Sequence, residues 1–378
     1  MNMRKATIII KIPNRWTQPQ LQSKNDGMTM PSKQQMKAIQ YSQLGGPEVL
    51  EYKDIPTPKP RANEILIKVL ATSINHIDIH FRRGLPGVQS PLPHIPGSDA
   101  VGIIEELGSS VHGFNKGDRI VMDPSASCGQ CDFCKEGRIN YCPKARILGR
   151  ENDGAYAEFM VIPQENAMKL PDGFDVNMAA AAPLVYLTAW SMVVSKGQLQ
   201  KGQTVLVMGA GSGVGSAAIQ IAKMLGADVF ATAGSEEKIQ KAKELLKVDQ
   251  AWNYNEIELD REVRAATEKK GVDLIIDSVG GRQWVPMLKA LKNGGTLVTC
   301  GATDGFDPKE DLRHIFFRQL RILGSTMGNR EEMREVMKHV FSGKLKPIVD
   351  QVFALKDAAK AHQYVQDRKV FGKVVLKP

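Results

Sequence analysis

The sequence predicts an α/β protein made of two parts: a small β-barrel with loops, followed by a parallel sheet covered by helices. Short β-rich runs separated by Gly and Pro fill residues 39–162. After residue 177, apolar strand-like runs alternate with amphipathic helix-like runs, a pattern typical of a parallel sheet buried on both faces. The length of 378 residues suits two domains, since one domain usually takes about 100–200 residues.

Composition and charge narrow the class of protein. Hydrophobic residues make up 42% and charged residues 24%, which excludes a wholly disordered chain. No apolar run reaches the roughly 18 residues that a membrane helix needs. The formal charge is +9, but residues 1–35 hold six Lys or Arg against one acid, and the rest is spread among alternating charges. We therefore expect a soluble protein that binds neither a membrane nor nucleic acid.

Residues 1–35 are polar and Gln-rich, without the periodicity of a helix or strand. The apolar run at 6–12 contains Lys11 and is too short for the core of a signal peptide. Met36 is a second possible start and opens a strand-like run at 36–41. We interpret residues 1–35 as a disordered tail or an over-extended start, with a basic docking arm or a transit peptide as the alternative.

The expected strands and helices follow the two sequence patterns described above. In the first part, the predicted strands are 65–71, 100–107, 119–122 and 155–162. The stretch 178–196 has helical composition. In the second part, the predicted strands are 204–208, 228–232, 272–277, 296–299 and 321–324, and the predicted helices are 213–225 and 236–246. A helix at 333–340 and a strand at 373–376 end the chain, and we expect this strand to return to the first part.

A glycine-rich loop joins the first strand and the first helix of the parallel part. It reads GAGSGVG at 209–215. Small residues let the backbone approach a pyrophosphate, whose charge then lies at the positive end of the following helix. Because the loop follows an apolar strand and opens a helix, it predicts a dinucleotide site. The expected contacts are Gly211, Ser212, Gly213 and Val214.

The end of the second parallel strand indicates which dinucleotide binds. An NAD site normally places Asp or Glu there for the ribose 2′-hydroxyl. Here the sequence ATAGS at 231–235 has no acid before Glu236, and Lys238 follows. A hydroxyl and a cation suit a 2′-phosphate, which favours NADPH with Ser235 and Lys238 as contacts. NADH is the alternative if Ser235 only caps the helix and Lys238 is solvated.

Four of the five cysteines lie within fifteen residues, with the spacing C-x2-C-x2-C-x7-C. Four thiolates at this spacing can close a tetrahedral zinc site without an open position, which is typical of structural zinc. An iron–sulfur site shares the first part of the spacing but usually has three residues before its last Cys. A secreted disulfide scaffold distributes its cysteines, so the cluster favours a cytoplasmic protein. The predicted zinc ligands are Cys128, Cys131, Cys134 and Cys142.

From Met36 to its C-terminus, the chain resembles the zinc-containing medium-chain dehydrogenase/reductase superfamily of alcohol dehydrogenases, quinone oxidoreductases and enoyl reductases. The motifs that carry the resemblance are PGSDAVG at 96–102, GDRIV at 117–121, the four-cysteine lobe, GAYAE at 154–158, TAW at 188–190, the loop at 209–215 and FGKVV at 371–375. The resemblance implies a GroES-like β-barrel catalytic domain plus a Rossmann dinucleotide-binding domain. It also implies a homodimer or homotetramer.

The resemblance further implies domain limits and cofactor contacts. The catalytic domain would span residues 36–180 with a zinc lobe at 123–147, the Rossmann domain 181–328, and residues 329–378 would return to the catalytic domain. Further cofactor contacts would be Thr188, which lies where relatives contact the nicotinamide, and Tyr254, Val279, Gly301 and Lys373. Cys300, at the end of a parallel strand, is interpreted as a core residue.

The family pattern fails where zinc alcohol dehydrogenases hold a catalytic zinc. Their first Cys falls at Asn75, their relay hydroxyl at Ile77, their His–Glu pair at Ser98 and Asp99, and their last thiolate near positions 184–185. Without a Lewis acid, an alkoxide at neutral pH lacks its stabiliser. An enolate or quinol oxygen can instead be stabilised by hydrogen-bond donors. We therefore expect NADPH-dependent reduction of an activated C=C bond or a quinone without catalytic zinc. The substrate would be a small-molecule carbonyl, enone, quinone or enoyl-CoA.

Three candidate roles follow from position. Asn75 or Tyr186 could donate a hydrogen bond to the substrate carbonyl, although Tyr186 also suits plain packing, and Thr188 would face the nicotinamide. An enoyl-CoA substrate would need a basic rim, for which Arg82 with Arg83, or Arg318 with Arg321, are candidates.

Two other functions remain open. An alcohol dehydrogenase or aldehyde (semialdehyde) reductase would need a non-standard catalytic zinc, with His76, His80, His94 and Asp99 as possible ligands. An NADPH-binding protein that binds RNA is the non-enzymatic alternative, which the lack of interleaved aromatic and basic residues disfavours.

Overall fold

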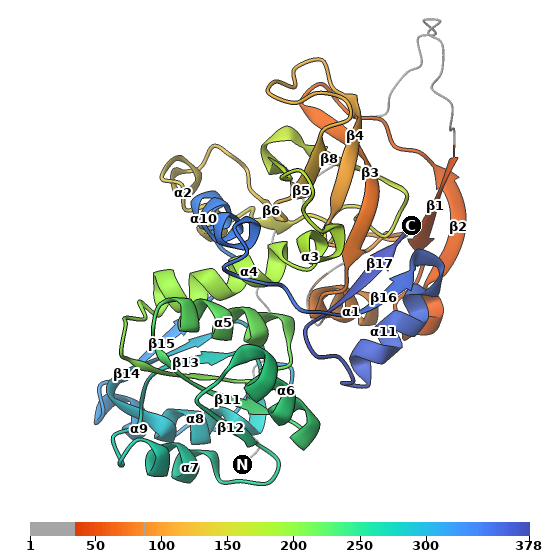
Figure 1. Cartoon of the computed structure of the whole chain (residues 1–378). Coiled ribbons are helices and arrows are strands. Elements are labelled where there is room, and N and C mark those ends of the chain that lie inside the picture. Colours follow the sequence, from red (N-terminus) through yellow and green to blue (C-terminus); the bar gives the residue numbers. More distant parts are fainter. Residues whose placement is uncertain (1–34, 86–87, 89) are drawn as a thin grey trace, which may run out of the picture.

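The computed structural model describes residues 35–85, 88 and 90–378. Residues 1–34, on which the expectation of a disordered tail falls, lie outside the described residues, and Gln35 already belongs to the first strand. Two large sheets lie in separate halves of the molecule, with helix α4 (Pro183–Trp190) between them (Figure 1). The predicted α/β class is confirmed. None of the helices in the described part of the chain is long and apolar enough to span a membrane.

The first sheet is mainly antiparallel and has the order β16-β17-β3-β4-β5-β9, with β8 paired to β3. Its strands are β3 (Glu64–Ser73), β4 (Val101–Leu107), β5 (Arg119–Met122), β8 (Phe159–Pro163), β9 (Ala167–Lys169), β16 (Val349–Ala354) and β17 (Lys373–Lys377). Ile65 and Ile67 of β3 and Ile104 of β4 are fully buried in one cluster, because alternate side chains of a strand point to the same face. A separate hairpin pairs β1 (Gln35–Gln40) with β2 (Glu51–Pro56).

Helices and short elements complete this half. They are η1 (Pro47–Val49), α1 (His76–Arg83), η3 (Gln164–Asn166), α3 (Val176–Ala180), η6 (Leu355–Asp357) and α11 (Ala358–Gln366). The cysteine lobe contains β6 (Ser125–Ala126), α2 (Asp132–Lys135), η2 (Ile139–Tyr141) and β7 (Arg146–Ile147). The strand expected at 155–162 begins only at Phe159, because the backbone N–H groups of Ala155 and Tyr156 bond to the loop at 96–97.

The second sheet is parallel and has the order β12-β11-β10-β13-β14-β15. Its strands are β10 (Thr204–Val207), β11 (Asp228–Ala233), β12 (Gln250–Asn253), β13 (Val272–Asp277), β14 (Leu291–Thr299) and β15 (Arg321–Gly324). Its helices are α5 (Gly213–Met224), α6 (Glu236–Leu246), α7 (Leu259–Ala266), η5 (Gly281–Gln283), α8 (Trp284–Ala290) and α9 (Arg313–Phe316). The expected strands at 272–277 and 321–324 match β13 and β15. The polar edge strand β12 was missed, since its sequence lacks an apolar run.

The helical stretch expected at 178–196 is divided into α3, α4 and the π-helical η4 (Ser191–Lys196). Pro183 is the first residue of α4, a position where the missing N–H of proline costs no hydrogen bond. Helix α10 (Arg330–Phe341) packs against α4. One apolar core contains Val101 of the first sheet, Val205 of the second and Leu187 of α4. Because this core is shared, the limits at 180/181 and 328/329 stay predictions.

The end of the chain returns to the first sheet. Strand β17 pairs antiparallel with β3, so that Val375 lies opposite Ser73. This pairing brings residues near position 373 beside the loop that follows β3. The expected return of the last strand thus positions the site described next.

Candidate active site and metal centre

The glycine-rich loop follows β10 and leads into α5, which begins at Gly213. Gly209 has a φ of 70°, in the left-handed region that favours glycine. A Cβ at Gly215 would lie 2.2 Å from the carbonyl oxygen of Gly209, so the loop closes only with glycine there. The Ser212 hydroxyl accepts the N–H of Gly215 at 2.9 Å and caps α5. Positions 211–214 thus form the helix N-terminus at which a pyrophosphate is favoured.

A cavity of about 300 Å³ opens beside this loop. Five of the predicted cofactor contacts line it: Gly211, Ser212, Lys238, Tyr254 and Val279. The hydroxyl of Ser235 accepts the backbone N–H of Lys238 at 3.4 Å and therefore caps α6. Gly301 lines a neighbouring groove instead, at the ends of β13, β14 and β15. The structure therefore gathers five of the eleven predicted contacts around one cavity.

The cavity carries an excess of positive charge. Lys238, Arg83, Arg282 and Arg368 line it, and Asp304 is the only acid among its described lining residues. Asp304 lies 3.4 Å from Arg282, which leaves three cations without an acid in the lining. The Lys238 ammonium donates to the carbonyl oxygen of Arg368 at 2.5 Å, which joins α6 to the segment before β17. This charge suits an anionic ligand.

His76 also lines this cavity, and the positive charges around it affect its pKa. Desolvation and, to a lesser extent, the nearby charges of His80, Lys373, Arg368 and Lys238 together lower the pKa of His76 to about 4. His76 is therefore neutral at pH 7 and adds no charge of its own.

A buried polar cluster lies where the family resemblance places the ligands of a catalytic zinc. The Asp99 carboxylate accepts hydrogen bonds from Ser73 Oγ at 2.7 Å, Asn75 Nδ2 at 2.8 Å and the backbone N–H of Leu184 at 2.9 Å. Lys373 Nζ lies 3.4 Å from the same carboxylate and donates to Asn75 Oδ1 at 2.5 Å. We name Asn75, Asp99 and Lys373 the amide–carboxylate–ammonium cluster.

This cluster keeps spare hydrogen-bond donors. An amide nitrogen has two N–H groups and an ammonium has three. Asn75 uses one N–H on Asp99, and Lys373 uses two on its two partners. One N–H of Asn75 and one of Lys373 therefore have no hydrogen-bond partner among the described residues. Burial lowers the pKa of Lys373, while the charges of Asp99 and Asp78 act in the opposite direction.

A series of hydrogen-bonded buried side chains runs from Arg82 to Asp78, which bonds to the backbone of Asn75 in the cluster. Arginine can only donate, so the 3.0 Å contact between Arg82 and His362 Nδ1 makes this nitrogen an acceptor. The neutral ring then donates from Nε2 to the Tyr156 hydroxyl at 3.1 Å, and Tyr156 donates to Asp78 at 3.4 Å. Asp78 also accepts the backbone N–H of Asn75 at 2.8 Å. The sequence did not predict these hydrogen bonds, because His362 lies 280 residues from Arg82 and no local spacing relates them.

The two predicted residues of α4 have different surroundings. Tyr186 is 1% exposed and belongs to the shared apolar core, where burial raises its pKa and the Gln220 side chain of α5 lowers it. This placement favours the packing interpretation of Tyr186 over the role of substrate donor. The Thr188 hydroxyl donates to the Leu184 carbonyl at 2.7 Å and lies 3.9 Å from the sulfur of Met327. Met327 itself lines a small cavity of about 40 Å³.

The alternative zinc ligands do not meet. His76 and His80 lie one turn apart on α1 with tilted rings whose centroids are 6.4 Å apart, whereas His94 contacts the Gly149 carbonyl and packs edge-on against Tyr41. Across the described residues, the four-cysteine cluster is the one group of three or more His, Cys, Asp or Glu side chains close enough to share a metal ion.

Three of the four arginines predicted to form a basic rim for an enoyl-CoA instead bond to groups within the protein. Arg82 is fully buried and bonds to His362 and Gln366, so it forms no rim. Arg318 donates to the Leu288 carbonyl at 2.8 Å, and Arg321 donates to Thr296 Oγ1 at 2.9 Å. Only Arg83 keeps a place on the nucleotide cavity.

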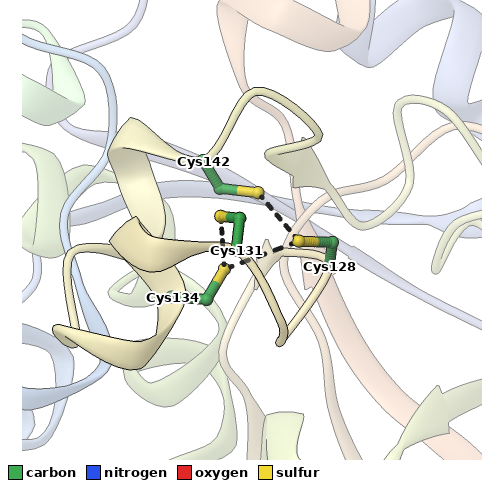
Figure 2. A group of neighbouring side chains, drawn as sticks. All are labelled: Cys128, Cys131, Cys134 and Cys142. Atoms are coloured by element: carbon green, nitrogen blue, oxygen red, sulfur yellow. Dashed lines mark hydrogen bonds between the residues drawn. The ribbon is translucent and has the colours of Figure 1, made fainter.

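The four cysteines of the lobe converge on one point (Figure 2). All four sulfur atoms lie within 4.8 Å of one another, with separations of 3.5 Å for Cys128–Cys142 and for Cys131–Cys134. A tetrahedral site with Zn–S bonds of about 2.3 Å needs sulfur atoms about 3.8 Å apart, so the quartet fits zinc. Backbone N–H groups of Gln130 and Cys131 lower the pKa of Cys128 to about 6, which favours the thiolate. Cys300 lies outside this group, and burial raises its pKa to about 12.

The two sheets, the capped glycine loop and the cysteine lobe define a nucleotide-dependent oxidoreductase of two domains. Two family models match the chain: alcohol dehydrogenase GroES-like domain at residues 61–172 and zinc-binding dehydrogenase at residues 213–342. The chain belongs to the zinc-type medium-chain dehydrogenase/reductase superfamily. The resemblance inferred from the motifs, the GroES-like and Rossmann fold and the assignment as an enzyme are all confirmed.

Individual relatives differ in activity. The chain is 33% identical to a NAD-dependent alcohol dehydrogenase of Saccharolobus solfataricus, over 91% of this chain and 100% of that protein. It is 29% identical to the human quinone oxidoreductase, over 90% and 97%. A solved structure described as a NAD-dependent alcohol dehydrogenase has a TM-score of 0.87 and 44% identity, over 91% and 100%. Both alcohol oxidation and quinone reduction thus occur among its relatives.

Proposed function

We propose that this protein is an NADPH-dependent reductase of an activated C=C bond or a quinone, which activates its substrate through hydrogen-bond donors. The observation that carries the proposal is the amide–carboxylate–ammonium cluster. Its members Asn75 and Asp99 stand at two positions where a catalytic zinc would need ligands, and all three members bond to one another. The donors left over suit an oxygen that gains negative charge during reduction.

The proposed roles of the cofactor and of the individual residues differ. NADPH, when bound, supplies the hydride. The loop at 209–215 holds the pyrophosphate at the N-terminus of α5. Asn75 and Lys373 donate hydrogen bonds to the substrate oxygen, and Asp99 orients both of them. Thr188 faces the nicotinamide, as its position beside Met327 allows.

The choice of NADPH rests on the charge of the nucleotide cavity. Lys238, Arg83 and Arg368 line it, and the end of β11 carries no acid that would bind a ribose 2′-hydroxyl. Ser235 adds a hydroxyl at the N-terminus of α6, although it also caps that helix. A 2′-phosphate would offset this positive charge, whereas the unphosphorylated ribose of NADH would not.

Alcohol dehydrogenation is the second candidate, and the names of the relatives at 33% and 44% identity favour it. It would need an electrophile for the alkoxide in place of the usual zinc. A metal bound by the amide–carboxylate–ammonium cluster would have to displace the Lys373 ammonium, which lies 3.4 Å from Asp99.

The two candidates are separated by one experiment on the purified full chain. NADPH and NADH oxidation is measured against quinones, enones, enoyl-CoAs and aldehydes, with metal counted on the same sample. We expect one zinc per chain, NADPH preference and turnover of enones or quinones. Two zinc ions per chain together with alcohol–aldehyde interconversion would overturn the proposal.

We also propose that the protein forms a homodimer or homotetramer, as the resemblance implies. Strand β15 is an edge of the parallel sheet, and Leu312 and Phe316 are exposed in the segment before it. Light scattering on the purified protein measures the assembly, and a monomer at micromolar concentration would contradict it.

A further inference from the structure

Four buried polar side chains lie next to the amide–carboxylate–ammonium cluster, and the proposed function assigns them no role. Arg82, His362 and Tyr156 are fully buried, and Asp78 is 3% exposed. Burial of a polar or charged side chain costs free energy unless hydrogen bonds offset it, and apolar packing avoids this cost. We name these four residues the buried polar series, and their hydrogen bonds show what they hold in place.

The hydrogen bonds of the series give each side chain one orientation. Arg82 can only donate, so Nδ1 of His362 accepts and Nε2 donates to the Tyr156 hydroxyl at 3.1 Å. The Tyr156 hydroxyl then donates its only hydrogen to Asp78 at 3.4 Å. Burial and the negative charge of Asp78 raise the pKa of Tyr156, so the hydroxyl keeps this hydrogen at neutral pH. The ring of Tyr156 is also fixed, since it packs edge-on against His362 with centroids 5.6 Å apart.

One end of the series lies at the cluster. Asp78 is the third residue of α1, and Asn75 directly precedes this helix. The Asp78 carboxylate accepts the backbone N–H of Asn75 at 2.8 Å and the Ser98 hydroxyl at 3.4 Å. Asp78 thereby holds the backbone of Asn75, while the Asn75 amide donates to Asp99. The direction in which Asn75 points therefore depends on where Asp78 is held.

The other end of the series lies on α11, in the C-terminal part of the chain. His362 and Gln366 are one helical turn apart, and both bond to the Arg82 guanidinium, at 3.0 and 2.5 Å. Helix α11 packs against β16 and β17, and β17 begins with Lys373. The C-terminal part thus contacts the cluster twice, because Lys373 does so directly and α11 does so through the series.

We propose that Arg82, His362 and Tyr156 are positioning residues of the reaction: through Asp78 they hold Asn75 in the orientation in which its amide donates to the substrate oxygen. This inference rests on the proposed function and deepens it. Misplacement of a group at the reacting centre by about 1 Å can lower a rate about 10²-fold. The series should act on the rate of reduction rather than on the affinity for NADPH, because none of its members is among the described residues that line the nucleotide cavity.

Tyr156→Phe breaks the series in the middle, because it removes the hydroxyl and keeps the ring. We expect kcat for enone or quinone reduction to fall about 10–100-fold and the Kd of NADPH to stay within about twofold. Tyr364→Phe is the matched control. Tyr364 lies on the same helix as His362, its hydroxyl donates to Asp350 at 2.8 Å, and its substitution should keep kcat. Urea unfolding of both variants measures how much stability each lost hydroxyl costs.

A pair of substitutions at His362 distinguishes hydrogen bonding from packing. His362→Leu fills the space without bonding, and we expect kcat to fall as far as in Tyr156→Phe. His362→Gln can accept from Arg82 and donate to Tyr156, so it should regain most of kcat. Because the bonds act one after another, Tyr156→Phe combined with His362→Leu should lose no more kcat than either substitution alone, whereas independent effects would multiply.

The outcomes separate this inference from the proposed function. If Tyr156→Phe keeps kcat as Tyr364→Phe does, or if the losses of the double variant multiply, the positioning role is wrong and the proposed function stands. If the wild type reduces aldehydes but neither enones nor quinones, the proposed function fails. The same variants then test the series on the aldehyde, whose oxygen accepts the same donors. If Tyr156→Phe does not fold, the His362 pair decides, and equal kcat for His362→Leu and His362→Gln would overturn the inference.

Discussion

Lys373 and Asn75 are 298 residues apart in the sequence, yet Nζ of Lys373 lies 2.5 Å from Oδ1 of Asn75. The pairing of β17 with β3 produces this contact, because Asn75 follows β3 and Lys373 begins β17. Asp99, from a third segment, accepts from both side chains. The contact joins the last strand of the chain to the first loop of the site.

Replacing Lys373 tests the cluster directly. Lys373→Met removes a donor from the proposed oxyanion position, and loss of one such donor typically lowers kcat about 10²–10³-fold. The variant also leaves Asp99 buried without its cation, which costs about 3–5 kcal/mol in typical cases. Enone or quinone reduction and urea unfolding measure the two effects.

A second substitution separates the two effects of Lys373→Met. Adding Asp99→Asn removes the buried charge, so the double variant should regain much of the stability but not the activity. Lys377→Met, at the exposed end of the same strand, is the matched control and should change neither. Full activity of a folded Lys373→Met protein would contradict the assigned role.

Lys238 provides a test of cofactor choice. Lys238→Ala should raise the Kd of NADPH about 10–100-fold, because a hydrogen bond to a charged group contributes about 1.5–3 kcal/mol. The Kd of NADH should stay within about twofold. Lys241→Ala, one turn further along α6 and paired with Glu237, is the control. Equal losses for both cofactors in calorimetric titration would show that Lys238 does not recognise the 2′-phosphate.

The cysteine quartet predicts a metal-dependent part of the stability. Cys142→Ser removes one of four thiolates, and we expect the zinc content to fall below one per chain. A loss of 2–3 kcal/mol would lower Tm by about 4–12 °C in a domain of this size. Cys300→Ser, which changes the cysteine outside the lobe, should keep both zinc and Tm. Metal analysis and calorimetry check the pair, and unchanged zinc in Cys142→Ser would exclude the proposed ligand set.

His362 predicts acid sensitivity. Burial and, to a lesser extent, the charge of Arg82 together lower the pKa of His362 to about 3, whereas an unfolded chain has a histidine pKa near 6.5. Between pH 6.5 and 3 the unfolded chain takes up a proton that the native state excludes. The free energy of unfolding therefore falls as the pH falls, by at most about 1.4 kcal/mol per pH unit.

A difference measurement isolates this effect from that of Asp78. Burial raises the pKa of Asp78 to about 7, so its contribution to stability changes in the opposite direction, falling as the pH rises from about 4 to 7. His362→Gln keeps an acceptor for Arg82 and a donor for Tyr156 but does not titrate. The stability difference between wild type and variant should therefore shrink as the pH falls from 7 to 4, measured by urea unfolding. A difference that is constant with pH would contradict a buried neutral His362.

Local patterns sufficed for much of the fold. The pattern of the apolar residues predicted β13, β15 and α6 with their observed limits; β13 is buried along most of its length and α6 buries one face. Edge and capping elements were predicted less well. Strand β12 has a polar sequence, and β8 begins four residues late because the preceding backbone bonds to the loop at 96–97.

The sequence by itself determined the family, the nucleotide loop and the cysteine quartet, because each depends on residues close together in the chain. Tertiary structure alone decided that Tyr186 packs against α5, that Arg82 is buried, and that Arg368 joins Lys238 at one cavity. It also brought Lys373 to Asn75. The physical reason is that these contacts join different elements of the chain, where strand pairing and burial, rather than local spacing, set which side chains meet.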